Sequence, residues 1–413
     1  MSHQFSKIKK IEASQIKVGM YIHDLCCDWM AHPFVRNRFL IESEQEIRKI
    51  TDAGIREIYI DTDKGLDVKN APTREEVREQ IEQEMVDIVA SQPARTIRTS
   101  LEEELIQARE IKGKARLLVG SLMHDARLGK AIELDRIEPV VQSMTDSIFR
   151  NSSALLGLLQ IRNKDDYTFL HSVSVCALLV AFCRSFDMDS DTIHQAGIGG
   201  LLHDIGKSRV KDEILNKPGK LTDEEFAIIK KHPEDSHDIL SNIKGIGPIP
   251  MDIALHHHER YNGSGYPEML EEERIGKLAQ MAAIVDVYDA ITADRCYHKG
   301  MPAVEALRKI YEWSKFHFNP QMVHAFLRCV GIYPVGTLVL LESAQLGVVI
   351  EINEKNLLAP KLNVFFNTKS NTYIKPREVD LSRPMGHGGG DRIISHESPA
   401  KWNIDPMRFA GLA

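Results

Sequence analysis

Three consecutive histidines, His256 to His258, stand immediately before a glycine-rich loop. Imidazole is a frequent ligand of divalent metals, and neighbouring histidines can serve one metal pair when the backbone holds them firmly. Residues 263–267, Gly-Ser-Gly-Tyr-Pro, are turn residues that cannot continue a helix. The segment predicts a metal site beside a shaped loop, and a solvated histidine cluster is the alternative.

A second group is the His203-Asp204 doublet, which follows an apolar segment rich in small residues. A buried carboxylate beside an imidazole is unfavourable unless it binds a cation. We therefore interpret the doublet as a pair of ligands in which Asp204 can bridge two metals. Lys207 would lie within reach of a phosphate held there, and the alternative is a helix-terminal aspartate with an exposed lysine.

Three further residues fit the same site. Asp286 is an acidic residue inside an apolar helical segment, and His171 stands at the head of an apolar core helix. His232 is predicted to end a helix that starts at the capping box of Thr222, because Pro233 would then stop that helix. A single histidine on an apolar face is more often a hydrogen-bonded core residue. Spacings of about one helix plus one loop, however, are typical of a bundle that points ligands inward.

These residues resemble the HD-GYP family, a branch of the HD phosphohydrolases. Residues 203–207 match its His-Asp-x-Gly-Lys signature, and residues 257–267 match its His-His-Glu and Gly-Tyr-Pro signatures. The resemblance continues through residues 294–297 and covers about half of the chain, near residues 150 to 340. It implies an all-helical catalytic domain, a centre of two or three metals, often iron or manganese, and phosphodiesterase activity on cyclic di-GMP.

The resemblance also assigns roles to single residues. The implied metal ligands are His171, His203, Asp204, His232, His257, His258 and Asp286. Asp204 and Lys207 are the expected catalytic residues, and Lys207 and Arg295 are expected to contact the substrate phosphate. Tyr167 stands where members with a third metal carry a glutamate, so we expect two divalent ions, iron or manganese.

Other positions on the substrate side differ from the family pattern or have two interpretations. His298 stands where a lysine is usual, and the adjacent Lys299 is the candidate for that phosphate contact. Gly265, Tyr266 and Pro267 are expected to shape the substrate rim or a partner surface. The alternative is a tight turn that only orients the two histidine ligands.

The expected function is hydrolysis of cyclic di-GMP to linear pGpG and on to GMP, which lowers this bacterial second messenger and favours motility over biofilm. One alternative is a non-catalytic receptor or scaffold that binds the dinucleotide, or a diguanylate cyclase through the Gly-Tyr-Pro loop. Another is an enzyme for a different cyclic dinucleotide. The complete set of ligands favours the enzyme, and a homodimer is compatible with it.

The composition limits the class of protein. A chain of 413 residues predicts two or three domains, and a net charge of −7 argues against binding to polymeric nucleic acid. The six cysteines lack zinc-type spacing and favour a reducing compartment. The N-terminus lacks an apolar signal segment, and no apolar run is long enough for a membrane span. We expect a cytoplasmic protein that does not bind membranes.

The expected fold is mainly α, with a helical HD-type bundle between two small β-rich parts. The predicted division is residues 1–70 as a β-rich module, 71–150 as a helical linker with packing helices, 151–333 as the catalytic domain and 334–413 as a β-appendage with a flexible tail around 386–390. A helix is predicted near 43–53, and a charged, solvated helix at 73–91. Strands are predicted at 336–341, 346–352 and 364–366.

Overall fold

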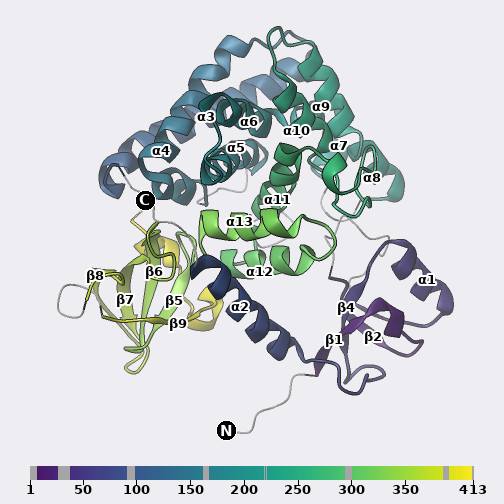
Figure 1. Ribbon diagram of the computed structural model, residues 1–413, viewed down its shortest axis with the longest axis vertical. Coiled ribbons are helices and arrows are strands. Elements are labelled where there is room, and N and C mark those ends of the chain that lie inside the picture. Colours follow the sequence, from purple (N-terminus) through teal and green to yellow (C-terminus); the bar gives the residue numbers. More distant parts are fainter. Residues whose placement is uncertain are drawn as a thin grey trace.

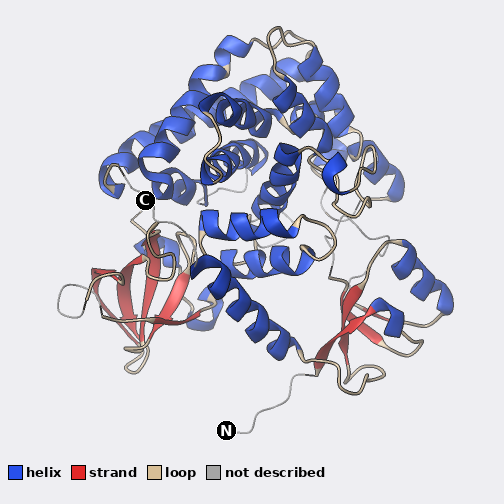
Figure 2. Cartoon of the chain, viewed as in Figure 1, coloured by secondary structure: helices blue, strands red, loops and turns tan. Residues whose placement is uncertain are grey.

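The computed structural model describes residues 7–26, 38–90, 98–160, 167–217, 219, 221–293, 300–384 and 390–411. Helices form most of its regular structure, and one small sheet lies near each end of the chain (Figures 1 and 2). The expected mainly α fold is confirmed. Within the described ranges, no helix is both long and apolar enough to cross a membrane. The predicted flexible tail falls largely on residues 385–389, which lie outside these ranges.

A four-stranded sheet, in the order β1-β4-β2-β3, forms the N-terminal part. Its elements are β1 (Ile8–Glu12), η1 (Ala13–Gln15), β2 (Tyr21–Asp24), β3 (Phe39–Leu40), α1 (Glu44–Asp52) and β4 (Glu57–Asp61). Isoleucines at alternate positions of β4 are fully buried, which gives the sheet one apolar face. Helix α1 begins with a capping box between Ser43 and Glu46, and it confirms the helix predicted near 43–53.

Helix α2 (Arg74–Ala90) follows the N-terminal sheet and lies against the helical part of the chain (Figure 1). Ile81, Met85 and Val89 are buried, and the helix contacts α12 (Ala303–Trp313) and α13 (Pro320–Val330). The prediction of a solvated linker helix is therefore wrong. Most residues of α2 are charged or polar, but the apolar residues at every fourth position are enough to bury one face of the helix.

The helical bundle contains α3 to α11. They are α3 (Leu101–Arg127), α4 (Glu138–Gln160), α5 (Tyr167–Ser185), α6 (Ser190–Leu202), α7 (Asp212–Leu215), α8 (Asp223–Ile229), α9 (His232–Ser241), α10 (Pro248–His256) and α11 (Lys277–Thr292), with the short turns η2 (Leu134–Arg136), η4 (Ile205–Arg209) and η5 (Glu272–Arg274). Helix α5 is central: residues 170–183 are all buried, and the helix packs against α3, α4, α6, α11 and α13. Close packing on every side fixes the position of any side chain that α5 carries.

A five-stranded antiparallel sheet, in the order β8-β7-β6-β5-β9, forms the C-terminal part. Its elements are β5 (Leu338–Leu341), β6 (Gln345–Glu351), β7 (Lys361–Asn367), β8 (Thr372–Asp380), β9 (Ile393–His396), α14 (Pro399–Trp402) and η6 (Pro406–Phe409). The three strands predicted here are confirmed, and β8 and β9 were not predicted. Both lie at sheet edges, and β8 is mostly exposed and contains Pro376, so its sequence lacks the pattern of a buried strand.

Candidate metal centre

Seven side chains from five parts of the bundle converge on one buried site. His171 comes from the second turn of α5, and His203 and Asp204 follow the end of α6. His232 begins α9, His257 and His258 follow the end of α10, and Asp286 lies in the middle of α11. None of the seven is more than 7% exposed, so water cannot stabilise the polar groups.

The structure places His232 differently from the prediction. The helix that starts at the capping box of Thr222 ends at Ile229, and His232 is the first residue of the next helix, α9. Pro233 lies in the first turn of α9, where its missing N–H has no helical acceptor to lose. The capping box is confirmed, but the prediction that Pro233 ends the helix of His232 is wrong.

The converging residues form three groups of possible ligands, and two of these share no residue. The two separate trios are His171, His203 and Asp286, and His232, His257 and His258; the third group, His203, Asp204 and His257, links them. Within each trio, one nitrogen or oxygen per residue lies within 4.8 Å of the other two. That separation suits residues that surround one metal ion.

Asp204 lies between the two trios and directs one oxygen toward each. Its Oδ2 is 3.5 Å from Nε2 of His171 and 3.4 Å from Nε2 of His203. Its Oδ1 is 3.2 Å from Nε2 of His232 and 3.9 Å from Nε2 of His257. A carboxylate in this position could bind two ions at once.

The contacts inside the second trio also fit a cation. Nε2 of His232 is 3.2 Å from Nε2 of both His257 and His258. Buried imidazole nitrogens that face each other at this distance repel unless a proton or a metal ion lies between them. In the first trio, Nε2 of His203 is buried and lies 3.4 Å from Asp204 Oδ2 and 3.7 Å from Asp286 Oδ1. Donors of this kind fit a divalent metal.

The charge states match this interpretation. Burial lowers the pKa of His257 and His258 well below the usual value, so both are neutral at pH 7, the form that coordinates metals. Burial alone would raise the pKa of Asp204, but the charges of Lys207 and His203 outweigh it and hold that pKa well below normal. Asp204 is therefore ionised.

The first trio contains the second carboxylate of the site, that of Asp286. Burial would lower the pKa of His203, but the carboxylates of Asp204 and Asp286 raise it to about 10. Burial would raise the pKa of Asp286, but the adjacent imidazoles of His171 and His203 hold it well below normal. Without a metal the two carboxylates keep a proton on His203, and a divalent ion would replace that proton.

Hydrogen bonds at Nδ1 orient four of the five histidines so that Nε2 faces the site. The acceptors are Gly200 O for His203 (2.8 Å), Ile229 O for His232 (2.7 Å), Ala254 O for His257 (3.0 Å) and Asp289 Oδ2 for His171 (2.7 Å). Such outer contacts fix the tautomer and the ring orientation of metal-binding histidines.

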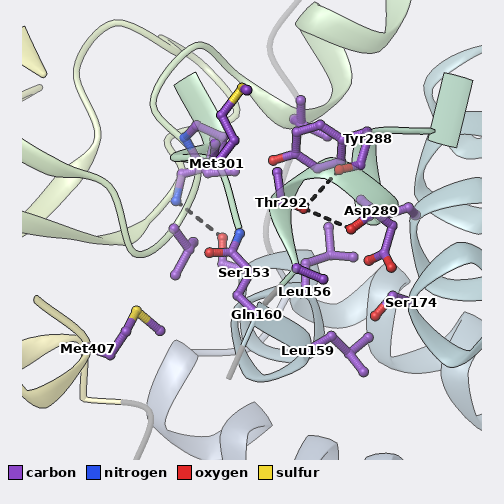
Figure 3. Close-up of a pocket in the computed structure, with 17 residues that line it drawn as sticks. Ser153, Leu156, Leu159, Gln160, Ser174, Tyr288, Asp289, Thr292, Met301 and Met407 are labelled. Atoms are coloured by element: carbon purple, nitrogen blue, oxygen red, sulfur yellow. Dashed lines mark hydrogen bonds between the residues drawn. The ribbon is translucent and has the colours of Figure 1, made fainter. Parts of the chain in front are cut away.

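Asp289 is a functional candidate that sequence reasoning did not single out. It is 2% exposed and lies one turn after Asp286 on α11. Its place on the same helix face was the available signal. Asp289 also lines a cavity of about 210 Å³ between α4, α5, α11 and the C-terminal part, together with Ser174 and Met407 (Figure 3). The carboxylate thus separates the metal centre from this cavity.

The residues expected to bind substrate are only partly described. Lys207 Nζ is 2.6 Å from Asp204 Oδ2, and its side chain is 22% exposed, so it lies between the site and the solvent. Arg295 and Lys299 lie outside the described residues. Gly265 is buried, and Tyr266 and Pro267 are half-buried, with the Tyr266 ring stacked on His258.

Comparisons with known proteins cover both main parts of the chain. Residues 8–137 match the model of a domain of unknown function (DUF3391), and residues 143–322 match the HD domain. A cyclic di-GMP phosphodiesterase of Pseudomonas aeruginosa is 42% identical over 98% of this chain and 96% of its own length. A cyclic di-GMP phosphodiesterase response regulator of Xanthomonas campestris is 32% identical over 54% of this chain and 59% of its own. A 3'3'-cGAMP-specific phosphodiesterase of Vibrio cholerae is 32% identical over 42% of this chain and 33% of its own.

Proposed function

The chain belongs to the HD-GYP family of HD-domain proteins, and from this premise we propose that it is a metal-dependent phosphodiesterase that hydrolyses cyclic di-GMP. The observation that carries the proposal is the pair of buried ligand trios on either side of Asp204. The nearly full-length similarity to the Pseudomonas aeruginosa phosphodiesterase supports cyclic di-GMP as the substrate.

The residues fit two divalent ions, one at each trio, with Asp204 shared between them. Nitrogen and oxygen donors without a thiolate suit iron or manganese. When bound, the ions would lower the pKa of water in the site and withdraw negative charge from the phosphate. The proposal of two ions also relies on Tyr167, at the position where family members with a third ion carry a glutamate.

The protein side chains position the phosphodiester and stabilise its charge. Lys207 reaches from Asp204 toward solvent, where its ammonium can contact a non-bridging phosphate oxygen and stabilise the transition state. Arg295 and Lys299 are proposed to hold the same phosphate. Water adds to phosphorus, the bond to the ribose 3′ oxygen breaks, and that oxygen takes up a proton. The product is linear pGpG, and a second hydrolysis gives GMP.

The test uses the full chain loaded with Mn(II), or anaerobically with Fe(II), and follows cyclic di-GMP and its products by chromatography. Asp204→Ala should abolish turnover, because it removes the ligand shared by both trios. Lys211→Ala, an exposed lysine seven residues later, is the matched control and should retain activity. Turnover that persists in Asp204→Ala would show that this carboxylate is dispensable. Cyclic di-GMP binding without turnover by the wild-type chain would favour the receptor alternative.

A second substrate also has a specific observation in its favour, since a relative specific for 3'3'-cGAMP is 32% identical over 175 residues. Running the same assay with 3'3'-cGAMP compares the two dinucleotides directly. A diguanylate cyclase partner and a homodimer are further parts of the proposal. Met269 is 65% exposed beside the Gly-Tyr-Pro loop and offers a contact for such a partner.

A further inference from the structure

His258 is held differently from the other four histidines of the metal centre. It is 4% exposed, and its Nδ1 has no hydrogen-bond partner among the residues that the structure describes; Asp286 Oδ2 lies 4.0 Å from it, beyond hydrogen-bond distance. Its Nε2 faces Nε2 of His232 at 3.2 Å, as required of a ligand in the second trio. An imidazole without an Nδ1 acceptor needs another contact to fix its orientation.

The ring of Tyr266 provides that contact. It stacks on the imidazole of His258 with the ring centroids 4.8 Å apart and an angle of 23° between the planes. The backbone N–H of Tyr266 also donates to the carbonyl oxygen of His258, at 3.3 Å. The ammonium of Lys230 lies 5.1 Å from the centroid of the Tyr266 ring, in cation–π range. Tyr266 is thereby fixed from two sides of the site.

Glu259, the residue after His258, folds the loop back onto the histidines. Glu259 is 2% exposed, and its carboxylate accepts hydrogen bonds from two backbone N–H groups, those of Glu268 at 2.8 Å and Leu270 at 3.1 Å. These bonds tie the segment after the Gly-Tyr-Pro triplet to the residue beside the ligand. A buried carboxylate with two such donors is a strong structural anchor.

Gly265 allows the loop to lie against the backbone of Glu259 and Arg260. A Cβ at this position would lie 2.6 Å from the carbonyl carbon of Glu259 and closer still to the backbone nitrogen of Arg260. Only glycine avoids that collision, because no other residue lacks a Cβ. The close approach places the next residue, Tyr266, over His258.

We propose that Tyr266 is a positioning residue for His258, in which ring stacking replaces the missing hydrogen bond at Nδ1. Glu259 and Gly265 hold the Tyr266 ring in place. The Gly-Tyr-Pro loop is then part of the metal centre, and its main role is to orient His258. The inference rests on the proposed function only in requiring a metal at the second trio.

The test measures Mn(II) binding to the full chain by calorimetry, without any substrate. Tyr266→Leu keeps an apolar side chain but removes the ring, and it should weaken binding of one ion by roughly 10- to 100-fold. Tyr266→Phe keeps the ring and should bind as the wild type does. Tyr261→Leu is the matched control, since its phenol lies in the same loop but points to Glu273 at 3.5 Å, and its Mn(II) affinity should not change.

Three results would overturn the proposal. In the first, Tyr266→Leu binds Mn(II) as the wild type does while its KM for cyclic di-GMP rises, which assigns the ring to the substrate. In the second, Tyr266→Phe loses as much affinity as Tyr266→Leu, which assigns the effect to the hydroxyl. The third result applies if Tyr266→Leu does not fold. Tyr266→Met then replaces it, because methionine fills similar space without a π face, and a wild-type affinity of Tyr266→Met for Mn(II) would overturn the proposal. A wild-type chain that binds Mn(II) but does not hydrolyse cyclic di-GMP would remove the proposed function alone.

Discussion

The carboxylate of Asp289 accepts the hydrogen bond from Nδ1 of His171, whereas backbone carbonyl oxygens accept the corresponding bond from three other histidines. A charged acceptor binds the Nδ1–H more strongly than a carbonyl does and makes the imidazole a better metal ligand. Asp289→Asn keeps the shape but removes the charge. We expect it to weaken Mn(II) binding by roughly 10- to 100-fold, as measured by calorimetry.

A matched control for Asp289 lies nearby. Asp252 accepts a hydrogen bond from Nδ1 of His256 at 2.7 Å, and His256 belongs to neither ligand trio. Asp252→Asn should therefore leave the affinity for Mn(II) unchanged. Equal affinities in the two variants would show that the contact of Asp289 with His171 does not affect the metal.

Residue types and motifs were enough to select the seven side chains that converge. His203, Asp204, His257 and His258 lie in motifs, and His171 and Asp286 are polar residues in apolar helices. Asp289 escaped selection because its partner is 118 residues away in sequence. The same holds for the stacking of Tyr266 on His258, which depends on the path of a loop. Contacts that orient a ligand leave little trace in the sequence, since they use ordinary residues.

Among the elements, the contact between η4 and α9 brings Asp204 and His232 together. A Cβ on Gly206 would collide with the carbonyl oxygen of His232 and lie 2.5 Å from the backbone nitrogen of Ser236. The hydroxyl of Ser236 also accepts from Gly206 N at 2.8 Å and donates to His203 O at 2.7 Å. The glycine of the His-Asp-x-Gly-Lys signature is thus required by close packing.

Gly206→Ala should separate η4 from α9 and lower both stability and metal affinity. Overpacking of this kind costs about 1–3 kcal/mol. Gly113→Ala in α3 is the opposite case, because a Cβ there has no atom within 4 Å, and it should stabilise the helix by up to about 1 kcal/mol. Urea unfolding of both variants checks the opposite signs. A Gly206→Ala chain as stable as the wild type would contradict the packing argument.

Elements with a strong apolar pattern were predictable, and elements that depend on their neighbours were not. Helix α5 and strands β5 and β6 are almost continuously buried and apolar, so their types follow from the sequence. Helix α2 buries only one narrow face, and β8 is a mostly exposed edge strand. The break between α8 and α9 was missed because proline suits the first turn of a helix as well as its end.

In the whole molecule, side chains of α12 contact three other parts of the chain: the N-terminal sheet, α2 and the C-terminal sheet. Tyr59 of β4 donates to Glu312 at 3.0 Å, which joins the N-terminal sheet to α12. At the other end of α12, Glu305 contacts Arg78 of α2 at 3.4 Å and His396 of β9 at 3.0 Å.

The carboxylate of Glu305 should make this docking sensitive to acid. Burial alone would raise its pKa, but the hydrogen bond from His396 and the charges of Arg308 and Arg78 lower it from 4.5 to about 2. A depressed pKa contributes stability that is present above pH 4.5 and is lost as the pH falls toward 2. We expect Glu305→Gln to lower the free energy of unfolding by about 1–3 kcal/mol at pH 7. Urea unfolding at pH 3 to 4 should show a smaller difference in this free energy between the variant and the wild type. Glu342→Gln, at an exposed ion pair, should cost little at either pH, and a Glu305→Gln penalty that does not change with pH would exclude this ion-pair origin.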